Sequence, residues 1–181
     1  MATVQPIKNI EDIERIKKSL HGRDRLLFVF GINSNLRISD ILTLKVGDVR
    51  NKTHLTIKED KTEKTKTFKF NKAIQDAVHE LITTCQVDDQ DWLFPSKRNR
   101  NNPLDRIQAY KILKNASDKV GLNINFGTHT MRKTWAYHRY INGASLPELM
   151  KALNHSSQRE TLRYIGIEQE EMDNLFDSVN L

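Results

Sequence analysis

The sequence predicts an α+β fold that is predominantly helical, with one small antiparallel β-hairpin at an edge. Most apolar residues recur at intervals of three and four, which is the spacing of amphipathic helices. Two short runs, residues 54–58 and 66–70, instead carry the alternation and the β-forming residues of strands. The 181 residues contain no internal repeat and no linker rich in proline and glycine, so we expect a single domain over residues 1–181.

Helix boundaries are predicted from capping residues and apolar spacing. Asn9 and Asn71 are suitable N-caps for the helices that follow them. Gly31 does not suit a helix interior, so its helix either ends early or packs closely there. Ile10 and Ile107 are assigned to the apolar faces of their helices. The predicted helices cover residues 10–20, 24–32, 38–44, 72–84, 106–120, 130–141, 146–153, 159–164 and 168–179.

Composition favours a polyanionic partner only mildly. The chain has 29 Lys and Arg against 23 Asp and Glu, a formal charge of +6 and a sequence pI of about 9.4. Its one cysteine, Cys85, excludes a disulfide framework within the chain and is expected to be a packed side chain. The sequence contains neither a run long enough to span a bilayer nor a signal peptide, so a cytoplasmic location is expected.

Five side chains of complementary chemistry follow one another along the chain: Arg37, His129, Arg132, His155 and Tyr164. Arginines offer planar donors that match phosphate oxygens. Histidines can donate to a phosphate oxygen or move a proton near neutral pH, and a tyrosine hydroxyl can become a covalent nucleophile. A surface arginine, a helix-end histidine and a core tyrosine are the commoner interpretations of each residue alone. Together these side chains are the parts needed to attack a phosphodiester.

The ordered set resembles the tyrosine recombinase (phage integrase) family, whose usual patterns are Gly-Leu-Arg-x-Ser-Glu/Asp, His-x-Leu-Arg-His and Leu-Gly-His-Ser, with a tyrosine nine residues after the last histidine. This chain reads Asn-Leu-Arg-Ile-Ser-Asp at 35–40, His-Thr-Met-Arg-Lys at 129–133 and Leu-Asn-His-Ser at 153–156. Asn35 and Asn154 replace Gly, and asparagine tolerates the left-handed backbone that glycine allows. Lys133 takes the place of the second histidine, and no role is assigned to it. The resemblance implies the catalytic-domain fold of this family.

It also implies roles for the residues. Arg37, Arg132 and His155 would grip the scissile phosphate and stabilise the charge of the transition state. Tyr164 would attack phosphorus and form a 3′-phosphotyrosyl bond, with the two arginines favouring its phenolate and His129 accepting or orienting the proton. No metal or cofactor is expected.

The resemblance further implies a catalytic lysine in the hairpin turn, to protonate the departing 5′-oxygen. Lys61, in Lys61-Thr62-Glu63-Lys64, fits this place best, although the neighbouring hairpin lysines compete with it. Other basic residues of the hairpin and of the polar loop 96–103 are expected to contact the DNA backbone. These predicted contacts are Lys58, Lys64, Lys66, Lys97, Arg98 and Arg100.

The partner implied is double-stranded DNA carrying recombination sites, bound by a homotetramer of a protein that is monomeric without DNA. The tail, residues 168–181, would dock on a neighbouring subunit or on its own domain. We also expect that the N-terminal core-binding domain of the family is absent, that an accessory DNA-bending protein takes part, and that the chain is encoded by a bacterium or a phage.

Three alternatives remain open. One is a DNA-binding regulator with this fold but no strand exchange, and another is a nicking enzyme that resembles type IB topoisomerases. A third is a helical scaffold with incidental basic charge. Integration, excision and inversion remain equally open as outcomes.

Overall fold

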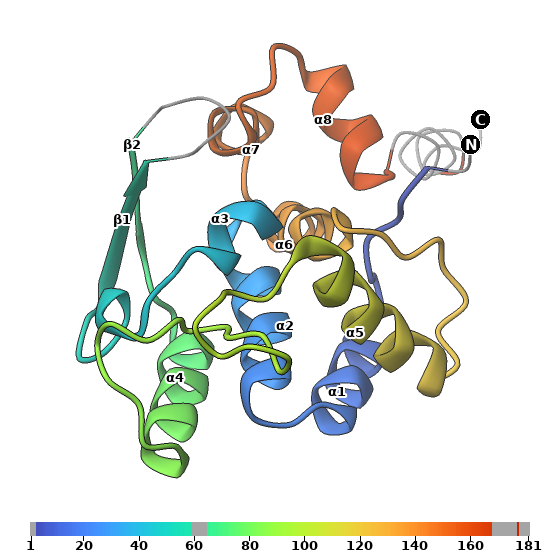
Figure 1. Cartoon of the computed structure of the whole chain (residues 1–181). Coiled ribbons are helices and arrows are strands. Elements are labelled where there is room, and N and C mark those ends of the chain that lie inside the picture. Colours follow the sequence, from blue (N-terminus) through green and yellow to red (C-terminus); the bar gives the residue numbers. More distant parts are fainter. Residues whose placement is uncertain (1–2, 59–64, 168–176, 178–181) are drawn as a thin grey trace.

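Helices form most of the chain, and a two-stranded hairpin lies at one edge (Figure 1). The structure, a computed structural model, describes residues 3–58, 65–167 and 177. The predicted α+β class is therefore confirmed, whereas the predicted helix at 168–179 falls largely outside the described residues. In chain order the elements are α1 (Ile10–Ser19), α2 (Gly22–Ser34), α3 (Ile38–Leu42), the 3-10 helix η1 (Val46–Asp48), β1 (His54–Lys58), β2 (Thr65–Lys69), α4 (Lys72–Thr84), α5 (Arg106–Lys119), α6 (Thr130–Ile141), α7 (Leu146–Leu153) and α8 (Gln158–Ile165).

The predicted caps set the starts of α1 and α4. The Asn9 side chain accepts a hydrogen bond from the amide of Glu11, and that of Asn71 accepts one from the amide of Ile74. Two predicted ends were wrong by two residues. The second helix runs through Ser34, beyond residue 32, and α3 stops at Leu42 instead of residue 44.

Two apolar assignments were also wrong. Ile107 is 67% exposed, because the buried stripe of α5 runs through Ala109 and Leu113; Ile107 lies roughly 200° around the helix from Ala109. Ile10 is 59% exposed, although Ile13 and Ile16 of the same helix are buried. It stands at the first residue of α1, where apolar spacing alone does not reveal that the packed surface has ended.

The hairpin is antiparallel, with Leu55 opposite Phe68 and Thr56 opposite Thr67. Two strands alone are marginally stable in water, so the hairpin depends on one apolar face. Leu55 is buried, and the ring of Phe68 meets that of Phe30 edge-on at 6.2 Å between centroids. β2 begins one residue earlier than predicted. The predicted turn, residues 60–64, and its lysines lie outside the described residues.

Close contact between α2 and α6 brings the end of one helix near the start of the other. A Cβ added at Gly31 would lie 2.3 Å from the Sδ atom of Met131. Glycine is therefore needed inside α2 for packing, which was one of its two predicted explanations. The contact also places Asn35, the residue after α2, beside Arg132 in the first turn of α6.

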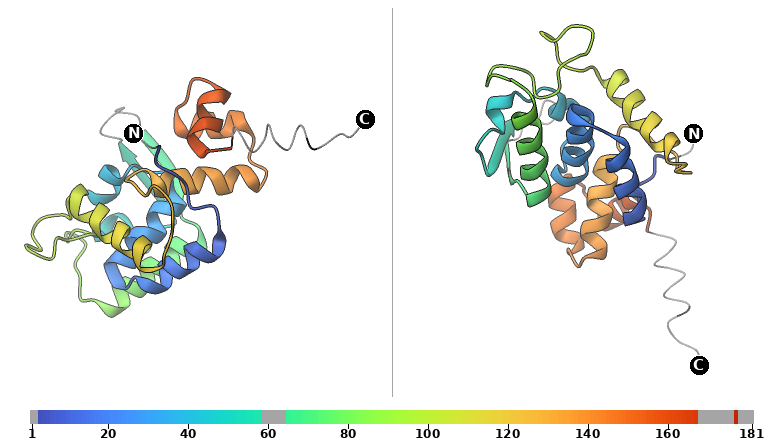
Figure 2. Two further views of the ribbon diagram at one scale, coloured as in Figure 1. Left: turned by 90° about the vertical axis from the view of Figure 1, so that its right-hand side faces the viewer. Right: turned by 90° about the horizontal axis from the view of Figure 1, so that it is seen from below.

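α6 takes part in two apolar clusters of unequal size. Met131, in its first turn, belongs to the main core around α2, α4 and α5. Ala136, further along α6, belongs to a small cluster with Leu153 of α7 and Ile165 of α8. The two further views in Figure 2 show α7 and α8 standing together at one side of the molecule. Within the described ranges, no helix has both the length and the apolar character needed to cross a bilayer.

Candidate active site

Helix ends carry the predicted catalytic side chains to one region. Arg37 is the N-cap of α3 and His129 the N-cap of α6, with Arg132 in the first turn that follows. His155 comes two residues after α7, and Tyr164 lies in α8. Figure 1 shows α3, α6, α7 and α8 meeting in its upper half. The charges of Arg37 and Arg132 act on both His129 and Tyr164, so the two arginines share one site.

Arg132 is held at the centre of this region. Its side chain is buried, and its Nε donates to the Oδ1 of Asn35 at 3.0 Å. Its Nη2 donates to the carbonyl of Leu153 at 3.4 Å. Asn35 in turn donates from Nδ2 to the carbonyl of Ala152 at 2.8 Å. As predicted, Asn35 and Asn154 adopt left-handed backbone angles, with φ of 55° and 60°.

Tyr164 is sheltered in the resting protein. Its hydroxyl oxygen is buried and has no hydrogen-bond partner among the described residues. Burial raises the pKa of Tyr164, while the positive charges of Arg132 and Arg37 lower it by less. The arginines thus act in the expected direction, but the net effect is opposite to the one expected, and the resting side chain is a neutral phenol.

The pKa values of both site histidines are lowered, which favours the neutral imidazole. Desolvation, followed by the charges of Arg132, Lys133 and Arg37, lowers the pKa of His129, although the residue as a whole is exposed. Desolvation also lowers the pKa of His155, opposed by Glu160. The Nδ1 of His155 lies 3.1 Å from the hydroxyl of Thr161, a fully buried residue of α8. This contact fixes the ring and leaves Nε2 to face a ligand.

Lys133 was given no role from sequence, yet it lies at the tyrosine. Its residue is only 6% exposed, and its Nζ lies 4.8 Å from the centroid of the Tyr164 ring. Burial lowers the pKa of Lys133. The ring of His155 meets the same tyrosine edge-on at 5.1 Å, so a cation and an imidazole flank the tyrosine ring. The available signal was the position of Lys133, directly after Arg132 and in place of the family's second histidine.

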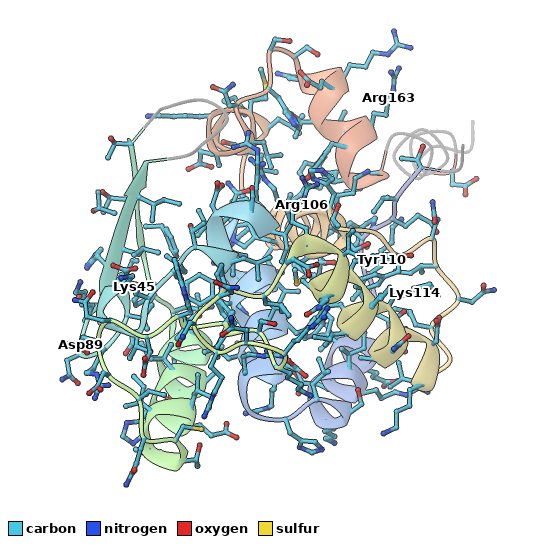
Figure 3. All side chains as sticks on the ribbon, viewed as in Figure 1. Lys45, Asp89, Arg106, Tyr110, Lys114 and Arg163 are labelled. Atoms are coloured by element: carbon cyan, nitrogen blue, oxygen red, sulfur yellow. The ribbon has the colours of Figure 1, made fainter. Side chains whose placement is uncertain are left out.

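An open hollow of about 510 Å³ borders the tyrosine, and its lining includes Lys133, His155 and Tyr164. Arg163, labelled on α8 in Figure 3, lines the same hollow and adds positive charge at its rim. A larger hollow of about 740 Å³ lies between α3 and α5. None of the five predicted side chains lines the larger hollow, whereas two of them, His155 and Tyr164, line the smaller one. We therefore assign the tyrosine chemistry to the smaller hollow.

Arg106 is a further cation that sequence reasoning missed. It is exposed at the first residue of α5, and Figure 3 shows it near the start of α6. Its charge contributes to the lowered pKa of His129. The described residues contain no group of three or more His, Cys, Asp or Glu side chains arranged to hold a metal ion.

The other predicted residues fall into two groups. Lys61 and Lys64 lie outside the described residues, and of Lys58 and Lys66 only the backbone positions on β1 and β2 are described. Lys97, Arg98 and Arg100 are exposed on their loop, as expected of DNA contacts. However, Lys97 lies 3.8 Å from Asp24 in the first turn of α2, roughly 16 Å of helix away from Asn35. The structure thus does not bring Lys97 together with Tyr164.

A mostly helical fold with these helix-end side chains around a tyrosine defines the class of tyrosine recombinase catalytic domains. The chain belongs to the phage integrase family, since residues 5–171 match the model described as "Phage integrase family".

Relatives and solved structures agree with this placement. The chain is 45% identical over 173 residues to the probable integrase/recombinase YoeC of Bacillus subtilis (strain 168), covering 94% of this chain and 93% of that one. It is 26% identical to the tyrosine recombinase XerA of Pyrococcus horikoshii, covering 80% of this chain and 50% of the relative. The chain thus spans about half the length of this XerA relative.

Two solved structures share the fold. The crystal structure of XerA recombinase superposes with a TM-score of 0.77 at 17% identity, covering 98% of this chain and 65% of that one. The catalytic domain of bacteriophage HP1 integrase gives a TM-score of 0.61 at 22% identity, with 96% and 94% covered. The predicted catalytic-domain fold is therefore confirmed.

Proposed function

We propose that this protein is a site-specific DNA recombinase that cleaves and rejoins strands through a 3′-phosphotyrosyl intermediate. The observation that carries the proposal is the sheltered Tyr164 hydroxyl, which lies within the field of Arg37 and Arg132. A tyrosine among cations at the rim of an open hollow is suited to attack a bound anion. Membership of the phage integrase family supports the same chemistry.

In the cleavage step, the Tyr164 oxygen bonds to phosphorus while the bond from phosphorus to the 5′-oxygen breaks. Because burial keeps the phenol neutral, its proton must leave as the new bond forms. His129 accepts this proton, a role supported by its lowered pKa, which leaves it unprotonated near neutral pH. Arg37, Arg132 and His155 stabilise the additional negative charge on the phosphoryl oxygens.

In the rejoining step, the 5′-hydroxyl of a second strand attacks the phosphotyrosyl ester and gives its proton to Lys61, the group that protonated the departing 5′-oxygen in cleavage. Tyr164 departs with a proton returned by His129. The ester retains the energy of the broken phosphodiester, so rejoining requires no ATP. Lys61 supplies the proton to the departing 5′-oxygen in the first step, an assignment that rests on the family resemblance. The remaining hairpin lysines and the loop cations Lys97, Arg98 and Arg100 would hold the DNA backbone.

Double-stranded DNA is the proposed partner. Structures similar in fold include the XerH recombinase bound to difH substrate and the Tn1549 transposon integrase with circular intermediate DNA. We propose that residues 1–181 act as one catalytic domain, monomeric alone and tetrameric on DNA, with residues 168–181 docking on a neighbour and an accessory DNA-bending protein assisting. The Bacillus subtilis relative supports a bacterial or phage origin, and with it a reaction in the bacterial cytoplasm.

The test is covalent trapping on a nicked suicide duplex carrying a recombination site, which can be sought among inverted repeats near the coding region. We expect the native protein to form an adduct that survives denaturation, linked to a 3′-phosphate. Tyr164→Phe should bind the same DNA and form no adduct, because the ring remains and only the nucleophilic oxygen is lost. Tyr110→Phe, at a half-buried position in α5, is the matched control and should react normally.

The results separate the alternatives. An adduct from Tyr164→Phe would assign the nucleophile elsewhere. DNA binding without any adduct from the native protein would indicate a regulator, and relaxation of supercoils without site preference would indicate a topoisomerase-like enzyme. Exchange between two sites identifies a recombinase.

A further inference from the structure

We propose that Asn35 is a positioning residue that sets the orientation of the Arg132 guanidinium toward the scissile phosphate. The proposal rests on the recombinase function above and adds a determinant that the predicted catalytic set lacks. It starts from a difference from the family pattern: Asn35 stands where glycine is usual, and glycine has no side chain that could make these contacts.

The Asn35 amide joins two other parts of the chain. Its Oδ1 accepts from the Nε of Arg132 at 3.0 Å, and its Nδ2 donates to the carbonyl of Ala152 at 2.8 Å. These partners are 97 and 117 residues away in sequence, so both bonds are tertiary links. Asn35 and Arg132 are only 8% and 6% exposed. Bonds made away from water face little competition from solvent, so they fix geometry well.

The three segments joined in this way all lead to catalytic side chains. Asn35 precedes Arg37 by two residues, and Ala152 precedes His155 by three. Arg132 itself belongs to α6, and its Nη2 also contacts the carbonyl of Leu153. The side-chain amide of Asn35 therefore links α6, the end of α7 and the residues just before α3 to one another.

The chemistry requires this alignment because a guanidinium is a planar fork that binds phosphate best when two of its donors face two oxygens. Asn35 holds Nε, which leaves the plane of the fork little freedom to rotate. Without this acceptor, Nε loses its 3.0 Å bond, and the guanidinium keeps the longer 3.4 Å contact from Nη2 to the carbonyl of Leu153, which restrains its plane less. Misplacement of a catalytic group by about 1 Å can cost roughly 100-fold in rate.

Asn35→Gly is the informative substitution, because glycine accepts the left-handed backbone at φ 55° without strain. The change removes the side-chain bonds and leaves the backbone conformation in place. Asn51→Gly is the matched control, since Asn51 has φ of 56° but is exposed in the turn between η1 and β1. Both substitutions alter side chain and backbone propensity in the same way.

We expect Asn35→Gly to slow single-turnover cleavage of the suicide duplex about 10- to 100-fold, with DNA affinity changed less than threefold. Asn51→Gly should react like the native protein. Native cleavage rates for Asn35→Gly would overturn the proposal. An equal loss of affinity and cleavage, together with a lowered melting temperature, would also overturn it by showing a merely structural role.

A second measurement does not depend on activity. In ¹⁵N spectra of arginine side chains, the Nε–H of Arg132, assigned by its loss in Arg132→Lys, should exchange slowly in the native protein and fast in Asn35→Gly. Equal exchange in both would overturn the positioning role. If the native protein traps no DNA while this exchange difference is present, the recombinase function fails and Asn35 still positions Arg132.

Discussion

Lys133 is a buried cation that contacts Tyr164, the proposed nucleophile, over the face of its ring and not through a hydrogen bond to its hydroxyl. Its ammonium lies 4.8 Å from the centroid of the Tyr164 ring, within the range of a cation–π interaction. Ionisation of a phenol increases the electron density of its ring, so the same cation attracts the phenolate more strongly than the phenol. Lys133 therefore packs over the tyrosine ring, and we expect it to stabilise the negative charge that develops on Tyr164 as its proton leaves.

Replacing this lysine tests that role. Lys133→Met keeps much of the side-chain volume and removes the charge, so we expect cleavage of the suicide duplex to slow about two- to thirtyfold, the range of one cation–π interaction. Lys133→Arg should retain more activity because it keeps a cation at the ring. Single-turnover cleavage rates provide the measurement.

Lys18→Met serves as the control, because Lys18 is exposed on α1 and loses the same charge. If Lys133→Met cleaves as fast as Lys18→Met does, the ring contact has no part in the reaction.

Single residues differ in how far the sequence reveals them. The left-handed backbone at Asn35 and Asn154 was predictable, because few residues other than glycine and asparagine tolerate it. The roles of Lys133 and Thr161 were not, since both depend on how α8 packs against its neighbours. The raised pKa of Tyr164 also follows from tertiary burial, which no local motif encodes.

Among the elements, α7 and α8 depend on the smallest amount of core. The small cluster that holds them comprises Ala136, Leu153, Ile165 and Ile167, with partly buried aromatic residues around it. The main core instead surrounds α2, which has seven buried residues in 13. Regions with few buried apolar contacts open at lower free energy than the rest of a protein. We therefore expect α8, which carries the proposed nucleophile, to be attached more weakly than the helices that carry the two arginines.

The smaller apolar core under α8 predicts that its amides exchange with solvent faster than those of α2. The amides of Leu162 to Ile165 should exchange about 100-fold faster than those in the centre of α2, because α8 can open without unfolding the main core. Ile165→Ala, which removes a fully buried side chain, should accelerate exchange in α8, because it lowers the free energy needed to open that helix. Hydrogen–deuterium exchange followed by mass spectrometry resolves the two helices.

Ile74→Ala is the matched change in the main core, where Ile74 is also fully buried. It should weaken protection in α2 and leave α8 unchanged, because the opening of α8 keeps the contacts of Ile74 intact. Equal loss of protection in both helices with Ile74→Ala would show that they unfold as one unit.

The sequence predicted elements better than their ends. Caps at Asn9 and Asn71 set helix starts correctly, because capping is a local interaction. Helix ends and apolar faces were less predictable: α2 continues past Gly31 because Met131 fills the space that a side chain would take. Ile107 shows the same limit, since its exposure depends on which side of α5 the core occupies.

At the scale of the whole molecule, the +6 charge is shared between the active-site region and more distant loops. Arg106 and Arg163 lie in the upper half of Figure 3 near the site, whereas Lys97 of the loop lies beside Asp24 in the first turn of α2. A duplex is much longer than this domain, so contacts at both places could act together. The order of motifs along the sequence indicated the site, but only the fold shows that Lys97 lies apart from it.

Salt dependence tests whether that loop holds DNA. Replacing Lys97, Arg98 and Arg100 by alanine should weaken binding and reduce the slope of log affinity against log salt by about one unit for each lost phosphate contact. Affinities measured by fluorescence anisotropy across a salt series give the slope.

The control replaces three exposed lysines of other surfaces, Lys18, Lys72 and Lys119, with the same change in net charge. The loop is excluded as a contact surface if both triple variants show the same slope.

The covered hydroxyl of Tyr164 also bears on target fidelity. Proteins that search DNA slide past many phosphates before they arrive at a specific site. A permanently ionised tyrosine could cleave the backbone at any of these phosphates. Here the hydroxyl oxygen is buried and keeps its proton, so a DNA backbone that touches the protein surface meets no exposed, ionised tyrosine. In the proposed reaction, a duplex can be cleaved only once the Tyr164 hydroxyl becomes accessible to its phosphate, so this protection is already present in the protein without DNA.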